Sequence, residues 1–156
     1  MYFWDVKKLT EDLKHNRVSA VEFKNYYIVL SLLLLAGQCL YSFSPAEESK
    51  MVLASLVIQV GLLLSWVNAM FHANGGQDGE MFLNRVISLS IPVTVKVSVY
   101  STFIMITLKS IIELFGNTIG LSWSENGEQI FALLFELGLT CFIYWRIYVA
   151  IKRINT

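Results

Sequence analysis

Charged residues are scarce in this chain of 156 residues. Lys, Arg, Asp and Glu together make up 15% of it, and apolar residues make up 55%, whereas an ordinary soluble domain has about 25% charged residues. This deficit argues against a typical soluble domain and predicts that lipid is the main solvent. The net charge is zero, so we expect no attraction to nucleic acid.

Cysteine, histidine and proline are also rare, with two residues of each. Cys39 and Cys141 fall within apolar stretches, where cysteine usually behaves as a small apolar side chain, and no zinc-ligand spacing occurs. The sequence contains no nucleophile–base–acid set and no hydrolase or metalloprotease motif. We therefore expect a non-enzymatic protein with no cofactor and no bound metal.

Long apolar runs, by contrast, are abundant. About 20 apolar residues are needed to cross a bilayer core about 30 Å thick, and four segments reach about that length: 25–43, 51–71, 86–108 and 129–151. The predicted fold is all-α and polytopic, with an amphipathic interfacial helix over 1–18 and a four-helix transmembrane bundle over 19–156. A short polar turn predicts that the first two spans form an antiparallel hairpin, and we expect the third helix to continue into 110–115.

The N-terminal segment alternates apolar and charged residues at helical spacing. Val6, Leu9 and Leu13 share one face of the expected helix. This helix lies either in the membrane interface, with Trp4 as an anchor at headgroup level, or packs as a cap on the bundle. Ser19 and Glu22 then fit a capping box that starts the next helix.

Lysine and arginine are distributed unevenly between the two sides of the expected bundle. Such residues favour cytoplasmic loops, and with the N-terminus inside, the inner set is Lys7, Lys8, Lys14, Arg17, Lys24, Arg85, Arg146, Lys152 and Arg153, against Lys50 and Lys109 outside. We expect a bacterial inner-membrane protein with both termini cytoplasmic. Trp123 and Arg146 are further candidate anchors at the interfaces. The N-terminal helix, the inner loop and the basic C-terminal end should share one surface.

Lys96 lies within the third span, close to the expected bilayer midplane. A charge there is costly and usually faces the bundle interior or a wet cavity. Glu136, on the fourth span, is the expected partner. Their pair either locks the two spans together, forms part of an ion or proton route, or is made between subunits. Gln38 and Gln59 complete the set of polar residues that could join an interior network.

Pro92 precedes Lys96 by one turn and should kink the third span, because proline removes a helical hydrogen bond and frees the carbonyl of Ser88. This helix is either an ordinary kinked helix or one that gates or lines a pathway. In the second span, small residues at a spacing of four predict a face for close helix packing: Gly61, Ser65 and Ala69.

The inner loop between the second and third spans is rich in glycine and polar residues. Its candidate site residues for headgroup or partner contact are His72, Asn74, Gly75, Gly76, Asp78, Glu80 and Arg85. The segment is either a plain tight turn, a backbone cradle for phosphate, or a His/Asp/Glu metal site. Arg85 could meet a lipid phosphate or pair with Asp78.

These features support three hypotheses about function. The first is an oligomeric, channel- or transporter-like assembly that passes an ion or small solute. The second is an adaptor, immunity or defence subunit of a membrane complex, which binds a partner through its cytoplasmic face. The third is an enzyme that acts on lipid headgroups through the glycine-rich loop. The bilayer and further protein subunits are the expected partners.

Overall fold

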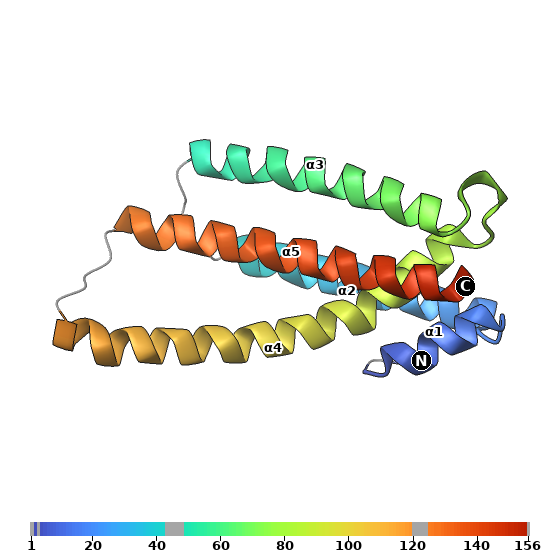
Figure 1. Cartoon of the computed structure of the whole chain (residues 1–156), viewed down its shortest axis with the longest axis horizontal. Coiled ribbons are helices and arrows are strands. Elements are labelled where there is room, and N and C mark those ends of the chain that lie inside the picture. The colour runs from blue at the N-terminus through green and yellow to red at the C-terminus, as the bar shows by residue number, and fades with distance from the viewer. Residues whose placement is uncertain (1, 3, 43–48, 120–124, 156) are drawn as a thin grey trace.

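The computed structural model describes residues 2, 4–42, 49–119 and 125–155 (Figure 1), without the side chains of 35–36, 38–42, 49–52, 113–119, 125–126 and 128–129. Its elements are α1 (Val6–Lys14), α2 (Ala20–Ser42), α3 (Ser49–Ala73), the 3₁₀ helix η1 (Gly76–Asp78), α4 (Phe82–Ile119) and α5 (Glu125–Asn155). All regular secondary structure over the described residues is helical, as the sequence predicts.

α1 and α2 begin at side-chain caps that the local sequence provides. The side chain of Asp5 accepts a hydrogen bond from the Lys8 amide (3.0 Å) and starts α1, and the chain leaves this helix through Asn16, which has a φ of 51°. The capping box at α2 is confirmed. The Ser19 amide donates to Glu22 Oε2 (3.1 Å), and the Glu22 amide donates to Ser19 Oγ (3.3 Å).

The four long helices run lengthwise and alternate in direction (Figure 1). Among the described residues, α3 packs against α5, α5 against α4, and α4 against α2. The predicted antiparallel direction of the first two spans is confirmed, whereas α2 and α3 are not among the extensively packed pairs of the described residues. A short connection fixes the relative direction of two helices, but it does not require them to touch along their length.

Both chain termini lie at one end of the bundle (Figure 1), which we call the terminal end. It comprises α1, the connection 74–81 and the last turn of α5, 150–155. α1 packs on α4 and α5 and buries Leu9 and Leu13. The three elements expected to share a surface thus meet at this end. The packing of α1 matches the cap alternative, whereas its contact with lipid stays a prediction.

The protein core also lies at the terminal end. α1 and the parts of the four long helices nearest that end contribute buried apolar side chains: Leu9, Leu13, Tyr26, Met70, Leu89, Ile91, Val93, Ile147, Ala150, Ile151 and Ile154. Farther along, large apolar side chains are exposed instead, for example Leu34, Leu56, Phe103 and Leu134. The apolar surface of the far half of the bundle therefore needs an apolar environment outside this chain.

Three helices in the described part of the chain are long and apolar enough to cross a membrane. The segments are Leu53–Ala73, Phe82–Ile112 and Ile130–Asn155, and at most 17% of the scored window in any of them is buried. This is consistent with an integral membrane protein. The first predicted span, 25–43, falls almost entirely in α2, which has 23 residues, and its crossing stays a prediction.

α4 differs from the other helices in length and shape. It has 38 residues and runs to Ile119, which confirms that the helix continues past the predicted span. Figure 1 shows that its first part runs at an angle to the remainder. Pro92 lies inside this helix and is fully buried, in agreement with the predicted kink.

Candidate functional site

The glycine-rich connection is a tight turn whose glycines are required by backbone geometry. Gly75 and Gly76 have φ values of 102° and 62°, in the left-handed region where other residues are strained. Gly79 has an ordinary φ, but a Cβ there would lie 2.1 Å from the Asn74 carbonyl oxygen. Glycine at these positions therefore lets the chain reverse direction between α3 and α4.

Asn74 organises this turn from within. Its side chain is only 2% exposed. Its Nδ2 donates to the Glu80 carbonyl (3.2 Å), and its Oδ1 accepts from Nη1 of Arg85 (2.8 Å). Asn74 thus satisfies its own buried amide by joining the two sides of the turn.

Arg85 extends the same network to the end of the chain. Its Nη1 also donates to Asn155 Oδ1 (3.1 Å), and Asn155 Nδ2 donates to the Ala73 carbonyl (2.8 Å). The ends of α3 and α5 and the start of α4 are therefore tied together. We call Asn74, Arg85 and Asn155 the amide–arginine network. Asn155 was missed from the sequence, where no local signal marks it.

The alternative in which Arg85 pairs with Asp78 is wrong. Arg85 is buried, whereas Asp78 is exposed, so the carboxylate remains in solvent while amide oxygens accept from the guanidinium. His72 and Glu80 are exposed as well. Among the residues that the structure describes, no three His, Cys, Asp or Glu side chains gather as a metal site would require. The loop contributes a structural clamp rather than a cluster of acid and base groups.

Lys96 and Glu136 have different partners from those expected. Nζ of Lys96 lies 5.8 Å from the ring centroid of Trp4, which in turn lies 6.3 Å from the ring of Tyr100. Glu136 Oε1 instead accepts from Nε2 of Gln59 (2.8 Å). The predicted Lys96–Glu136 pair is therefore wrong. Among the described side chains of the expected polar network, Gln59 and Glu136 are in contact.

The hydroxyl groups of α4 are largely satisfied by their own helix. Ser90 donates to the Val86 carbonyl (2.7 Å) and Thr102 to the Ser98 carbonyl (2.9 Å). Such back-bonding is typical of serine and threonine in apolar helices. Ser88 Oγ, one turn before Pro92, is fully buried and has no hydrogen-bond partner within the described part of the chain. The polarity of this helix is thus mostly internal.

The remaining predicted residues divide into described and undescribed ones. Trp4 is half exposed and Arg146 is exposed, as interface anchors would be, although their contact with lipid stays a prediction. Trp123 lies outside the described residues, and the side chain of Gln38 does as well.

Comparison with known proteins provides no family for this chain. The sequence matches no family model. Neither curated proteins nor solved structures provide a match. Function must therefore be inferred from the contacts and exposure described above.

Proposed function

We propose that this chain is a non-enzymatic membrane protein of four spans that assembles with further copies of itself into a channel- or transporter-like oligomer. The observation that carries the proposal is the Gln59–Glu136 hydrogen bond between α3 and α5. Glu136 is exposed although it lies inside a segment apolar enough to cross a membrane. A carboxyl group exposed to lipid is costly, so another subunit or a water-filled path should cover it.

Aromatic and basic side chains support a membrane boundary close to the terminal end. The ring of Trp4 lies beside Lys96 and Tyr100 of α4. Trp66 of α3 contacts Tyr148 of α5, with ring centroids 6.1 Å apart. Tryptophan, tyrosine and lysine commonly occupy the headgroup level. Lys96 would then lie at the interface rather than at the midplane, where its cation can reach water and the ring of Trp4.

The same boundary would place Glu136 deep in the bilayer. Glu136 precedes Trp145, an exposed aromatic of α5, by about 14 Å of helix at 1.5 Å per residue. That is close to half of a core about 30 Å thick. The charged centre of the proposed assembly is therefore Gln59 with Glu136, and the offset in depth from Lys96 is consistent with the absence of an ion pair between these two described residues.

An open face of α3 supports association of several chains. The small-residue stripe predicts a face for close helix packing, yet within this chain a Cβ added at Gly61 would meet nothing within 4 Å, and Ser65 is exposed. Small residues allow the close helix approach by which membrane helices associate. A second copy is the simplest partner for this face in a symmetric oligomer.

The oligomeric state and ion flux of the full chain test this proposal. The purified protein is reconstituted in native-lipid nanodiscs for mass determination and in vesicles for flux measurement. We expect an oligomer, and we expect Glu136→Leu to reduce flux more than Glu136→Gln because glutamine keeps a hydrogen-bonding group beside Gln59. Leu134→Val is the matched control, since it changes an exposed apolar side chain of the same helix. A monomer at all concentrations, with no flux, would overturn the proposal.

A second candidate function follows from the terminal end. α1, the glycine-rich connection and the end of α5 are fixed to one another by packing and by the amide–arginine network. With the lysine and arginine bias placing this end in the cytoplasm, it would offer a rigid surface to a partner subunit. Affinity purification from membranes at native expression tests this alternative, and recovery of this chain alone would contradict it.

A further inference from the structure

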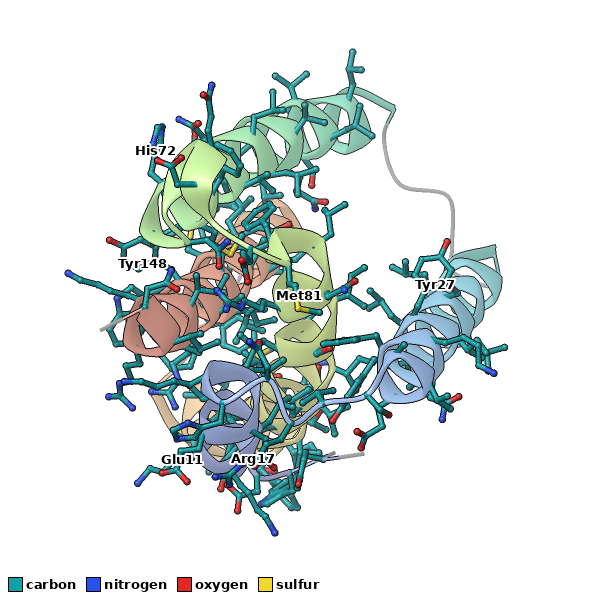
Figure 2. All side chains as sticks on the ribbon, turned by 90° about the vertical axis from the view of Figure 1, so that its right-hand side faces the viewer. Glu11, Arg17, Tyr27, His72, Met81 and Tyr148 are labelled. Carbon is teal, nitrogen blue, oxygen red and sulfur yellow. The ribbon has the colours of Figure 1, made fainter. Side chains whose placement is uncertain are left out.

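A small pocket opens beside Arg85 at the terminal end. Its volume is about 40 Å³, and its lining residues are Leu13, Asn16, Val18, Phe23, Met81 and Arg85. One water molecule needs about 10–15 Å³ on such a scale, so the pocket has room for two or three oxygen-sized atoms. The walls come from the α1–α2 connection, the start of α2 and the start of α4. Figure 2 labels Met81 at this end, in the middle of the bundle.

Arg85 brings a positive charge to this pocket without a bonded carboxylate. Arginine has five N–H donors, and the two hydrogen bonds of Arg85 to asparagine both use Nη1. Over the described residues, the only fully buried side-chain nitrogen or oxygen atom without a partner is Ser88 Oγ, so the other Arg85 nitrogens reach accessible space. Among the described residues, Arg17 forms an ion pair with Asp12. The Glu80 carboxylate affects Arg85 only through longer-range electrostatics.

Two residues with left-handed backbone line the same pocket. Asn16 and Met81 have φ values of 51° and 53°, and they are the two residues other than glycine with positive φ in the described part of the chain. Asn16 follows the end of α1, where asparagine commonly adopts this conformation. Met81 has no such role and is strained, and backbone strain often accompanies a binding site.

We propose that this pocket binds a phosphate group, through the free N–H donors of Arg85 and the side-chain amide of Asn16. Planar guanidinium is suited to bidentate contact with phosphate oxygens, and the pocket has room for the two or three oxygens of one such group that face Arg85. The apolar walls fit the remainder of a phosphate ester. Arg85 lies about 16 Å of helix from Lys96, toward the terminal end. A lipid headgroup and a free phosphate both carry the phosphate group that such a pocket would bind.

Substitution of Met81 provides a test that leaves the amide–arginine network intact. Met81 is 42% exposed, so Met81→Glu and Met81→Gln should both fold, and the two differ only in charge. The carboxylate of Met81→Glu would occupy the place of the anion beside Arg85. The full-length variants are compared in phosphate-free maltoside detergent by thermal unfolding, with inorganic phosphate or phosphatidylglycerol added, and with chloride at equal ionic strength as the control.

We expect the ligand to raise the melting temperature of the natural protein and of Met81→Gln, because binding to the folded state stabilises it. Affinity should fall at least about tenfold in Met81→Glu, as loss of a charged hydrogen bond predicts. A response to inorganic phosphate identifies a free phosphate as sufficient, and a response to phosphatidylglycerol alone identifies a headgroup. No response, or an equal response of Met81→Glu and Met81→Gln, would overturn the proposal.

Discussion

Gln59 and Glu136 join α3 to α5 through a hydrogen bond of 2.8 Å between Nε2 and Oε1. The same Gln59 nitrogen also donates to Ser55 Oγ (3.1 Å), so it has two hydrogen-bond acceptors. Lys96 takes no part in this contact, and its Nζ lies over the ring of Trp4 instead. Lys96 and Glu136 therefore belong to separate parts of the molecule.

This separation predicts which residues are energetically coupled. Lys96→Met and Trp4→Leu should each lower stability by roughly 0.5–1 kcal/mol, the usual range for an exposed cation–π contact, and the double variant should lose less than the sum. Lys96→Met and Glu136→Leu should instead be additive within about 0.5 kcal/mol. Thermal unfolding of the three single and two double variants in one detergent measures both cycles. If Glu136→Leu restores the stability lost in Lys96→Met, the two charges interact after all.

The amide–arginine network predicts a large effect at a neutral residue. Asn74→Ala removes one acceptor of Arg85 and the donor to the Glu80 carbonyl, so the free energy of unfolding should fall by about 1–3 kcal/mol. Gln77→Ala is the matched control, because Gln77 is an exposed amide of the same connection. Equal melting temperatures for the two variants would show that the network contributes nothing to stability.

The hydroxyl of Tyr2 should lose its proton only at unusually high pH. Its hydroxyl donates to Asp12 Oδ2 (2.5 Å), and this bond to a carboxylate raises the pKa of Tyr2 from 10.0 to about 12. The neutral phenol is therefore favoured in the folded state, and its stabilising contribution is complete below pH 10 and lost as pH rises toward 12. Absorbance titration of the natural protein minus Tyr2→Phe isolates this group. Asp12→Asn should return its pKa toward 10, and a late titration that persists in Asp12→Asn would contradict the assignment.

Local sequence signals predicted the start of α2 and the tight turn. The Ser19–Glu22 capping box and the glycine-rich turn depend on residues close together in the chain, so their chemistry can be interpreted from spacing alone. The four apolar segments likewise coincide with α2 to α5, and three of them meet the length and hydropathy needed to cross a membrane.

The partners of Lys96 and Arg85 could not be predicted in the same way. Leu89 and Ile91 are buried in protein, while Phe103 and Ile104 on the same helix are exposed, and an apolar run alone does not distinguish these environments. The predicted third span was therefore centred on Lys96. Arg85 bonds to Asn155, 70 residues away, and such a pairing depends on how α3, α4 and α5 pack.

Among the glycines whose surroundings the structure describes, Gly79 should be the one least tolerant of alanine outside positions of positive φ. The added Cβ would lie 2.1 Å from the Asn74 carbonyl oxygen and 2.6 Å from its Nδ2, so the turn must shift and weaken the hydrogen bond to Glu80. A loss of roughly 1–3 kcal/mol is expected for such overpacking. Gly138→Ala is the matched control, because its Cβ would meet nothing within 4 Å and alanine favours a helix by about 1 kcal/mol over glycine. Thermal unfolding should thus move in opposite directions for the two variants. A Gly79→Ala protein as stable as the natural one would show that the connection can relax, and the clamp formed by Asn74 would then be less rigid than its contacts indicate.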